Sequence, residues 1–310
     1  MSTSTKEKRV VAVVGATGRQ GGGLVRSILE ADDGFAVRAL TRDPESPQAK
    51  ELAALGVELV VADLDDARSV EAAFSGAYGA FCVTAAQEHP PERERAHAAT
   101  MAAAARAAGL AHVVWSTFED TRAFLPPGDE RMPVLHGEYR VPHYDAKGAS
   151  DAEFRGVPTT FLRTAFYWEN LLDGGGPARD EDGVRRLALP LGSARLPGIA
   201  VADIGRCAYA ILRRPDLAGR TVSITGENLT GAELAAAFAD VLGEPVRYED
   251  VPLEVLRSLG IPQAAELANM FRFTQDFETA YAGARDPAEV RKLHPGLLTF
   301  RRWLTERNPR

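Results

Sequence analysis

The chain has 310 residues, of which 45% are hydrophobic and 25% charged, a composition typical of a globular protein with a sizeable core. Its formal net charge of −7 argues against a nucleic-acid-binding surface, which needs a basic patch. No apolar segment approaches the ~20 residues of a membrane-spanning helix. Residues Met1–Arg9 lack the apolar stretch of a secretory signal. We therefore expect a cytoplasmic protein with a frayed N-terminal end and neither nucleic acid nor membrane as a partner.

The two cysteines, Cys82 and Cys207, lie in apolar segments and do not indicate a disulfide framework. No grouping of His, Cys and carboxylate residues has the spacing of metal ligands. We expect no bound metal.

From Arg9 to Thr164, short apolar runs alternate with helical segments. The expected strands are Val10–Val14, Phe35–Leu40, Val57–Val61, Ala80–Val83, His112–Ser116 and Thr159–Arg163. The expected helices are Gly21–Ala31, Pro47–Leu55, Ala67–Phe74, Glu92–Ala108 and Asp145–Arg155. This alternation indicates a parallel sheet with right-handed crossovers. We predict an α/β fold with a Rossmann-type, doubly wound parallel sheet.

After Thr164 the alternation weakens. The expected elements are helices at Asp203–Arg213 and Gly231–Leu242, strands at Thr221–Ile224 and Val246–Tyr248, and a mostly helical remainder from Leu253 to Arg307. We predict a dinucleotide-binding domain at 1–165 and a smaller, mixed, mostly helical domain for substrate or partner at 166–310. The two are expected to interleave, with 200–225 returning to the first.

The strongest local motif is Gly15-Ala-Thr-Gly18-Arg-Gln-Gly21, between the first strand and the first helix. Gly15 permits a tight turn, Gly18 lets the backbone approach a pyrophosphate, and Gly21 lets helix and strand pack closely. The N–H groups at the helix start supply an anion site. The alternative is a purely structural turn, but the motif opens a βαβ unit and this position favours a dinucleotide site.

The residue after the second strand distinguishes the cofactors. An acidic residue there favours NAD, whereas Arg42 offers a charge-assisted, bidentate grip on the 2′-phosphate of NADP(H). Asp43 is the counter-argument, although Pro44 after it suggests that Asp43 caps the following turn. The alternative for Arg42 is a solvated surface side chain. We predict NADP(H) as the cofactor.

Two further contacts follow from the rule that ligands lie beyond the carboxyl ends of parallel strands. Asp63 and Leu64 follow the third strand and are placed to bracket the adenine. Thr84–Ala86 follow the fourth strand and are placed beside the nicotinamide ribose. Each segment is equally compatible with an ordinary turn.

Several motifs together resemble those of NmrA-like proteins, in the atypical short-chain dehydrogenase/reductase group. They are the glycine turn, Thr41–Pro44, Asp63 with its acidic helix start, Tyr167-Trp-Glu-Asn-Leu-Leu172 and Glu266-Leu-Ala-Asn-Met-Phe-Arg-Phe273. The resemblance covers nearly the whole chain and implies a cytoplasmic NADP(H) sensor. It implies cofactor contacts by Gly15, Ala16, Thr17, Gly18, Arg19, Gln20, Arg42, Asp63, Thr84 and Lys147, and contacts to the nicotinamide half by Tyr167, Glu169 and Asn170. From the residues alone, the segment around Tyr167 is equally compatible with core packing.

A typical short-chain dehydrogenase carries a Tyr and a Lys four residues apart on one helix face, and a Ser after the fifth strand. Ser116 and Lys147 fit this pattern, but His143 stands at the Tyr position. Tyr144 is displaced by one residue, or about 100° around the helix. The sequence does not decide whether Tyr144 or His143 substitutes for the missing Tyr.

Lys147 is the only lysine between Lys50 and Lys292 in an arginine-rich chain, which favours a contact with ribose hydroxyls over a solvated position. His143 either serves as an acid or base, since imidazole titrates near neutral pH, or lies on the surface. Lys147, His143 and Ser116 are the candidate catalytic residues.

Two functions remain open. The first is an NADP(H)-binding redox sensor or regulator that lacks the usual catalytic Tyr, with Leu171–Arg179 and Thr121–Val141 as the expected movable segments. The alternative is an NADPH-dependent oxidoreductase, similar to quinone or isoflavone reductases, that uses Lys147 and His143. The partner is a small-molecule acceptor or a regulatory protein, and a homodimer is left open.

Overall fold

A computed structural model describes residues 8–85, 90–126, 128–261 and 263–307, and the chain forms two compact units. Unit 1 comprises Met1–Phe118, Ala146–Arg163 and Ile204–Val222; unit 2 comprises Glu119–Asp145, Thr164–Asp203 and Ser223–Arg310. Relative to a division at 165/166, the segment Glu119–Asp145 groups with unit 2. The expectations for residues 1–7 and for Ala86 lie outside the described residues.

Unit 1 is built on a seven-stranded sheet in the order β11-β6-β5-β4-β1-β2-β3. The strands are β1 (Arg9–Val13), β2 (Phe35–Thr41), β3 (Glu58–Val61), β4 (Gly79–Cys82), β5 (His112–Thr117), β6 (Thr159–Arg163) and β11 (Thr221–Ser223). All pairings from β3 through β6 are parallel. The strand order reverses between β1 and β4, which is the topological switch point of a doubly wound sheet. The predicted Rossmann-type fold is confirmed.

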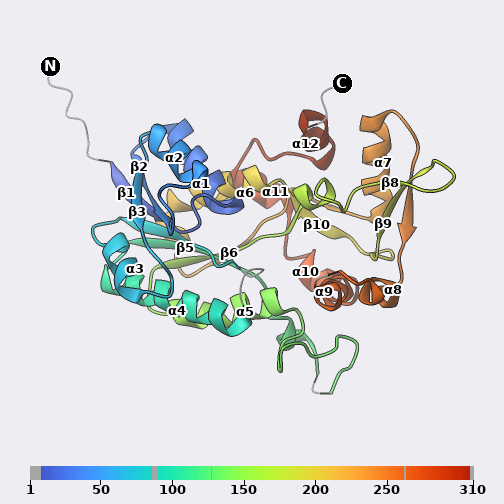
Figure 1. Ribbon diagram of the computed structural model, residues 1–310, viewed down its shortest axis with the longest axis horizontal. Helices are drawn as coiled ribbons and strands as arrows, with labels where there is room; N and C mark the ends of the chain where they lie inside the picture. The colour runs from blue at the N-terminus through green and yellow to red at the C-terminus, as the bar shows by residue number, and fades with distance from the viewer. Residues whose placement is uncertain (1–7, 86–89, 127, 262, 308–310) are drawn as a thin grey trace. The chain divides into compact units, whose positions relative to one another are not determined.

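Helices cover both faces of this sheet. Figure 1 shows α1 (Arg19–Ala31) and α2 (Pro47–Ala54) on one face, and α3 (Ala67–Phe74) and α4 (Pro91–Ala107) on the other. The central strands β4 and β5 are buried along their whole length, because helices cover both faces of the sheet there.

Helix α6 (Val201–Leu212) supplies Gly205, which lies against Gly23 of α1. A Cβ on Gly205 would lie 2.2 Å from the Gly23 carbonyl carbon, so glycine is what allows the two backbones to approach.

The helix predicted at Asp145–Arg155 has different bounds. Helix α5 spans Pro142–Ser150 and is followed by a 3₁₀ turn at Asp151–Phe154. Pro142 is accommodated in the first turn of α5 because no intrahelical partner exists there for an N–H group. Helix α1 also begins two residues before the predicted start, with Gly18 as its N-cap.

Unit 2 contains two three-stranded sheets and several short helices. One sheet has the order β12-β10-β7, and the other β13-β9-β8. Their strands are β7 (Phe166–Tyr167), β8 (Ala178–Arg179), β9 (Arg185–Leu189), β10 (Leu196–Ile199), β12 (Glu227–Leu229) and β13 (Val246–Asp250). The helices are α7 (Gly231–Leu242), α8 (Leu253–Ser258), α9 (Ala264–Asp276), α10 (Glu278–Tyr281), α11 (Pro287–Leu293) and α12 (Phe300–Arg307), with 3₁₀ turns at Thr121–Phe124 and Trp168–Leu171.

Buried polar groups fix the first segment of unit 2. The Arg285 guanidinium, fully buried, donates to both Glu119 carboxylate oxygens at 2.8 and 2.9 Å and to the Thr164 carbonyl. The buried Asp145 carboxylate accepts from the N–H groups of Thr121 and Arg140 at 2.7 Å each. Such fully paired groups anchor the irregular chain between 121 and 141.

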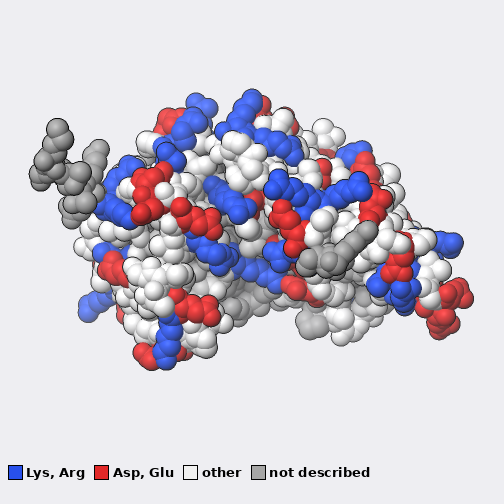
Figure 2. Space-filling model, turned by 90° about the horizontal axis from the view of Figure 1, so that it is seen from above, with Lys and Arg blue, Asp and Glu red and all other residues white. Residues whose placement is uncertain are grey.

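Across the described part of the chain, no helix combines the length and apolar character that a membrane span requires. Acidic and basic side chains are intermixed on the face of the molecule shown in Figure 2.

Candidate functional site

The glycine turn after β1 has the geometry of a close backbone crossing. Gly15 has a φ of +64°, and its carbonyl accepts from the Gly18 N–H at 2.8 Å. A Cβ on Gly21 would lie 2.3 Å from the Gly15 carbonyl oxygen, so only glycine fits there. Gly18 is the N-cap of α1 and has no side chain that could bond the first N–H groups of that helix.

A cavity of about 500 Å³ lies in unit 1 at the carboxyl ends of β1, β2, β3 and β4. Six of the predicted cofactor contacts line it: Gly15, Thr17, Gly18, Arg42, Asp63 and Leu64. Ala16, Arg19, Gln20 and Thr84 are not among the lining residues, although Val83 and Ala85 on either side of Thr84 are. The cavity therefore occupies the switch point at which doubly wound sheets bind dinucleotides.

Arg42 is exposed at the end of β2, and its neighbour Asp43 is engaged in a local turn. The Asp43 carboxylate accepts from the Glu45 N–H at 2.9 Å, and the Asp43 carbonyl accepts from the Ser46 hydroxyl. Ser46 in turn caps α2. Asp43 thus stabilises the turn that leads into α2, in agreement with the expectation from Pro44.

Two side chains of α4 that line the cavity, and the carboxylate that both of them contact, were not identified from the sequence. Arg93 and His97 of α4 line the cavity, and both contact Asp65 in the loop after β3. The His97 Nε2 lies 2.8 Å from Asp65 Oδ1, and the Arg93 guanidinium pairs with both oxygens of that carboxylate. Hydrogen bonds from Arg93 and His97 hold the pKa of Asp65 well below its usual range.

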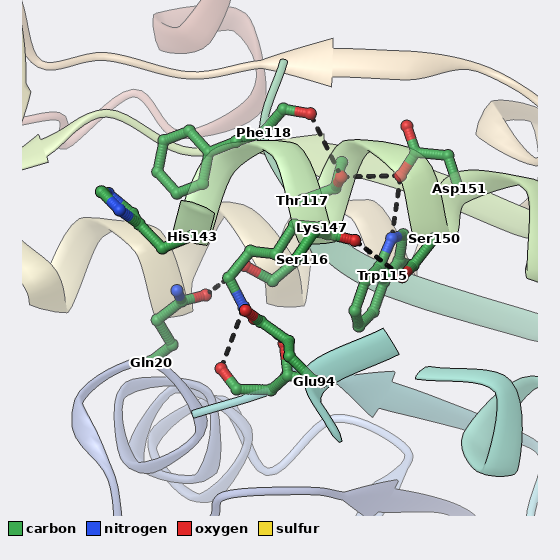
Figure 3. A network of polar contacts seen from close by, with 12 residues as sticks. Gln20, Glu94, Trp115, Ser116, Thr117, Phe118, His143, Lys147, Ser150 and Asp151 are labelled. Carbon is green, nitrogen blue, oxygen red and sulfur yellow. Dashed lines mark hydrogen bonds and ion pairs between the residues drawn. The ribbon is translucent and has the colours of Figure 1, made fainter. Parts of the chain in front are cut away.

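Lys147 is buried and fully engaged within unit 1 (Figure 3). Its ammonium donates to the Thr84 carbonyl at 2.9 Å, to the Thr84 hydroxyl at 2.5 Å and to Glu94 Oε1 at 2.6 Å. An ammonium group has three N–H donors, and these three acceptors match that number. Glu94 was not predicted as a partner, because nothing in the sequence links the first turn of α4 to α5.

Ser116, the predicted carbonyl-polarising residue, is also buried. Its hydroxyl donates to the Gln20 side-chain oxygen at 2.8 Å (Figure 3). In this arrangement Ser116 joins β5 to the start of α1.

The two candidates for the missing tyrosine contact other residues of unit 2. Tyr144 is buried, and its hydroxyl lies 2.9 Å from that of Tyr281. Burial raises the pKa of Tyr144 well above its ordinary value, which disfavours proton transfer near neutral pH. The His143 Nδ1 pairs with the Glu266 carboxylate. Although burial raises the pKa of Glu266, hydrogen bonding to His143 brings it below its ordinary value.

The segment predicted to reach the nicotinamide has clear partners within unit 2. The Glu169 carboxylate accepts from the Val201 N–H at 3.1 Å, from the Trp303 indole N–H at 3.2 Å and from Arg307 at 3.1 Å. Tyr167 forms part of β7 and pairs with Ile199. The Asn170 carbonyl accepts from the Gly175 N–H at 3.1 Å. Cofactor contacts by these residues stay a prediction.

Among the described residues, no group of three or more His, Cys, Asp or Glu side chains has an arrangement suited to a metal ion.

Sequence comparison identifies the relatives of this chain. The model of the NmrA-like family matches residues 7–304. An NmrA-like family domain-containing oxidoreductase, FrzB of Cladobotryum sp., is 32% identical over 91% of this chain and 88% of its own length. An NAD(P)H azoreductase of Xenophilus azovorans is 30% identical over 82% of this chain and 83% of its own.

The solved structure of NmrA, a negative transcriptional regulator, superposes with a TM-score of 0.82 and 26% identity over 98% of this chain and 96% of its own. NmrA has also been crystallised in complex with NAD and with NADP. The family model covers nearly the whole chain, and the solved structure shares its fold throughout. The chain belongs to the NmrA-like family.

Proposed function

We propose that this protein binds NADP(H) in the cavity of unit 1 and serves in the cytoplasm as a redox sensor or regulator. The observation that carries this proposal is the placement of Arg42, Asp63 and the glycine turn around one cavity at the switch point of the sheet. Arg42 stands where a guanidinium would grip the 2′-phosphate. The complexes of NmrA with NAD and NADP support a nicotinamide dinucleotide as the ligand.

The side chains that would perform proton transfer favour sensing over the usual dehydrogenase chemistry. Lys147 and Ser116 are buried and bonded to protein partners, and Tyr144 is buried against Tyr281. The bound cofactor would supply hydride chemistry, but Tyr144, which is next in sequence to the usual tyrosine position, bonds Tyr281 instead of being available to a substrate oxygen. A sensor needs only that the oxidised and reduced cofactor bind two states of the protein with different free energies. A regulatory protein partner would then bind one of these two states in preference to the other.

A second candidate function is an NADPH-dependent reductase of activated acceptors. It is favoured by the names of the relatives, which include NmrA-like oxidoreductases and an NAD(P)H azoreductase. Reduction of a quinone transfers a hydride from NADPH to the acceptor and takes the remaining proton from water, so it does not require a protein acid. His143, with Glu266 orienting its ring, would be the available acid or base.

The two candidates are separated by one experiment on the purified full chain. NADPH is incubated with a panel of quinones, azo dyes and aldehydes while the reduced-nicotinamide absorbance is followed, and calorimetry measures NADPH binding in parallel. The sensor proposal predicts binding without sustained turnover. Turnover that is lost in Lys147→Ala, with the variant folded by circular dichroism, would establish the reductase instead. No heat with either NADPH or NADH would exclude both.

A further inference from the structure

The dinucleotide cavity has a second arginine that sequence motifs do not reveal. Arg93 lies in the first turn of α4 and lines the cavity together with His97, one turn further along the same helix. Glu94, between them, is buried and bonds Lys147 instead. The cavity therefore receives cationic side chains from two directions: Arg42 from the end of β2 and Arg93 from α4.

Asp65 holds the Arg93 guanidinium in a defined plane. Arg93 Nε and Nη2, which lie along one edge of the group, both bond the Asp65 carboxylate. His97, with only 4% of its surface exposed, bonds the same carboxylate, at 2.8 Å from Asp65 Oδ1. The Asp65 N–H donates to the Asp63 carboxylate at 3.0 Å, so the arrangement is tied to the loop after β3. A guanidinium fixed in this way is preorganised for one flat ligand.

The charges on the two arginines suit different parts of a dinucleotide. Arg93 is paired with the Asp65 carboxylate, which weakens the net attraction of its guanidinium for a phosphate. A planar guanidinium can, in addition to its ion pair, pack against an uncharged aromatic base. The loop after β3, which holds Asp65, also carries Asp63 and Leu64, the residues predicted to bracket the adenine. Arg42, which follows β2, stands where the 2′-phosphate is read.

We propose that Arg93 contacts the adenine base of the dinucleotide through its guanidinium plane, with Asp65 as its positioning residue. This inference rests on the proposed binding of NADP(H). It assigns the two arginines different tasks: Arg42 distinguishes NADP from NAD, whereas Arg93 contributes equally to both because it recognises the base that they share.

The test is calorimetric titration of the full chain with NADP, NAD, 2′,5′-ADP, 5′-AMP and nicotinamide mononucleotide. Arg93→Ala should weaken every adenine-containing ligand by a similar factor, about fivefold for a partly exposed stacking contact. Binding of nicotinamide mononucleotide should not change. Arg93→Lys should behave like Arg93→Ala, because lysine keeps the charge but lacks the planar group. Arg95→Ala, on the same helix and not among the lining residues, is the matched control and should bind as the wild type does.

Asp65→Asn separates positioning from a general effect on folding. It should weaken the adenine ligands in the wild-type background and have much less effect in the Arg93→Ala background, as in a double-mutant cycle for coupled residues. Arg42→Ala should instead weaken NADP and 2′,5′-ADP selectively.

The inference is overturned if Arg93→Ala binds all ligands normally. It is equally overturned if the loss is confined to ligands with a 2′-phosphate and is restored by Arg93→Lys, because Arg93 would then be a second phosphate contact. If the wild type binds none of these ligands, it is the proposed function that fails, and this result is distinct from both.

Discussion

At the level of single residues, the buried Lys147–Glu94 pair is expected to contribute strongly to stability. Both side chains are nearly inaccessible, with exposed fractions of 6% and 2%. Lys147→Met leaves a buried carboxylate without its counter-charge, and the loss of one partner of such a pair typically costs about 3–5 kcal/mol. The urea midpoint followed by circular dichroism should fall markedly.

The double variant Lys147→Met/Glu94→Gln should recover part of this loss, because it removes the orphaned charge. Lys292→Met is the matched control: Lys292 pairs with Glu289, and both side chains are more than 60% exposed. It should change the midpoint hardly at all. A wild-type midpoint for Lys147→Met would show that the buried pair does not form.

Substitution of Tyr144 shows whether this residue replaces the catalytic tyrosine that is missing at position 143. Tyr144→Phe removes a buried hydroxyl that bonds Tyr281, and a loss of about 1 kcal/mol in the free energy of unfolding is expected. NADPH affinity and any acceptor turnover should stay unchanged. Tyr281→Phe is the natural comparison, since the double variant should lose less than the sum of the two single losses. A large drop in turnover with Tyr144→Phe would restore the tyrosine to the mechanism.

At the level of elements, the turn between β1 and α1 depends on one glycine more than on its neighbours. A Cβ on Gly21 would lie 2.3 Å from the Gly15 oxygen and 2.6 Å from its carbon, so the backbone must move. A Cβ on Gly22 meets its nearest backbone atom, the Ala16 oxygen, at 3.2 Å. Both Gly→Ala changes gain about 1 kcal/mol of helix propensity. The difference in stability between the two variants therefore measures the cost of the close backbone approach at Gly21.

We therefore expect Gly21→Ala to lower both the thermal midpoint and the NADPH affinity, and Gly22→Ala to affect each much less. The measurements are a thermal melt and a calorimetric titration of both variants. Equal behaviour of the two would mean that the crossing of helix and strand tolerates a methyl group.

The elements also show what the sequence can and cannot predict. The strands of unit 1 were predictable because each is a run of apolar residues between helical segments, and their carboxyl ends meet at one edge. This rule alone placed Arg42 and Asp63 beside one cavity. In unit 2 only β13 was predicted, and β7, β8, β9, β10 and β12 were missed. The two-residue strands β7 and β8 offer too few positions for a periodicity. The contacts of Arg93 with Asp65 and of Glu94 with Lys147 were not predicted. Adjacent residues of a helix point in different directions, and the sequence does not show which neighbouring element each one meets.

At the level of the whole molecule, the division into units depends on contacts that have no local signal. Glu119 and Arg285 form a buried ion pair although they are 166 positions apart in the chain. That pair binds the segment after β5 into unit 2. Neither residue stands in a motif, and a sequence pattern describes neighbours along the chain rather than such distant partners. The return of the chain to the first unit was expected from sequence only for 200–225, where a predicted helix is again followed by a predicted strand.

Both cysteines lie in unit 1 and provide a probe of its folding. Cys82 of β4 and Cys207 of α6 are fully buried, and burial raises the pKa of the Cys82 thiol. Since the thiolate is the nucleophile, a disulfide reagent should label neither thiol in the native protein and both in denaturant. Labelling then reports opening of the unit that holds the cavity.

A ligand that binds only the folded unit slows such labelling by a factor set by its concentration over its Kd, about 100-fold at 100 Kd. NADPH should protect both thiols to this extent, and the protection should decrease in Arg42→Ala in proportion to the lost affinity. NADPH that binds by calorimetry yet leaves the labelling rate unchanged would mean that the dinucleotide binds outside unit 1. Because one thiol lies in the parallel sheet and the other in a helix of the same unit, the experiment tests where the ligand binds and not only whether it binds.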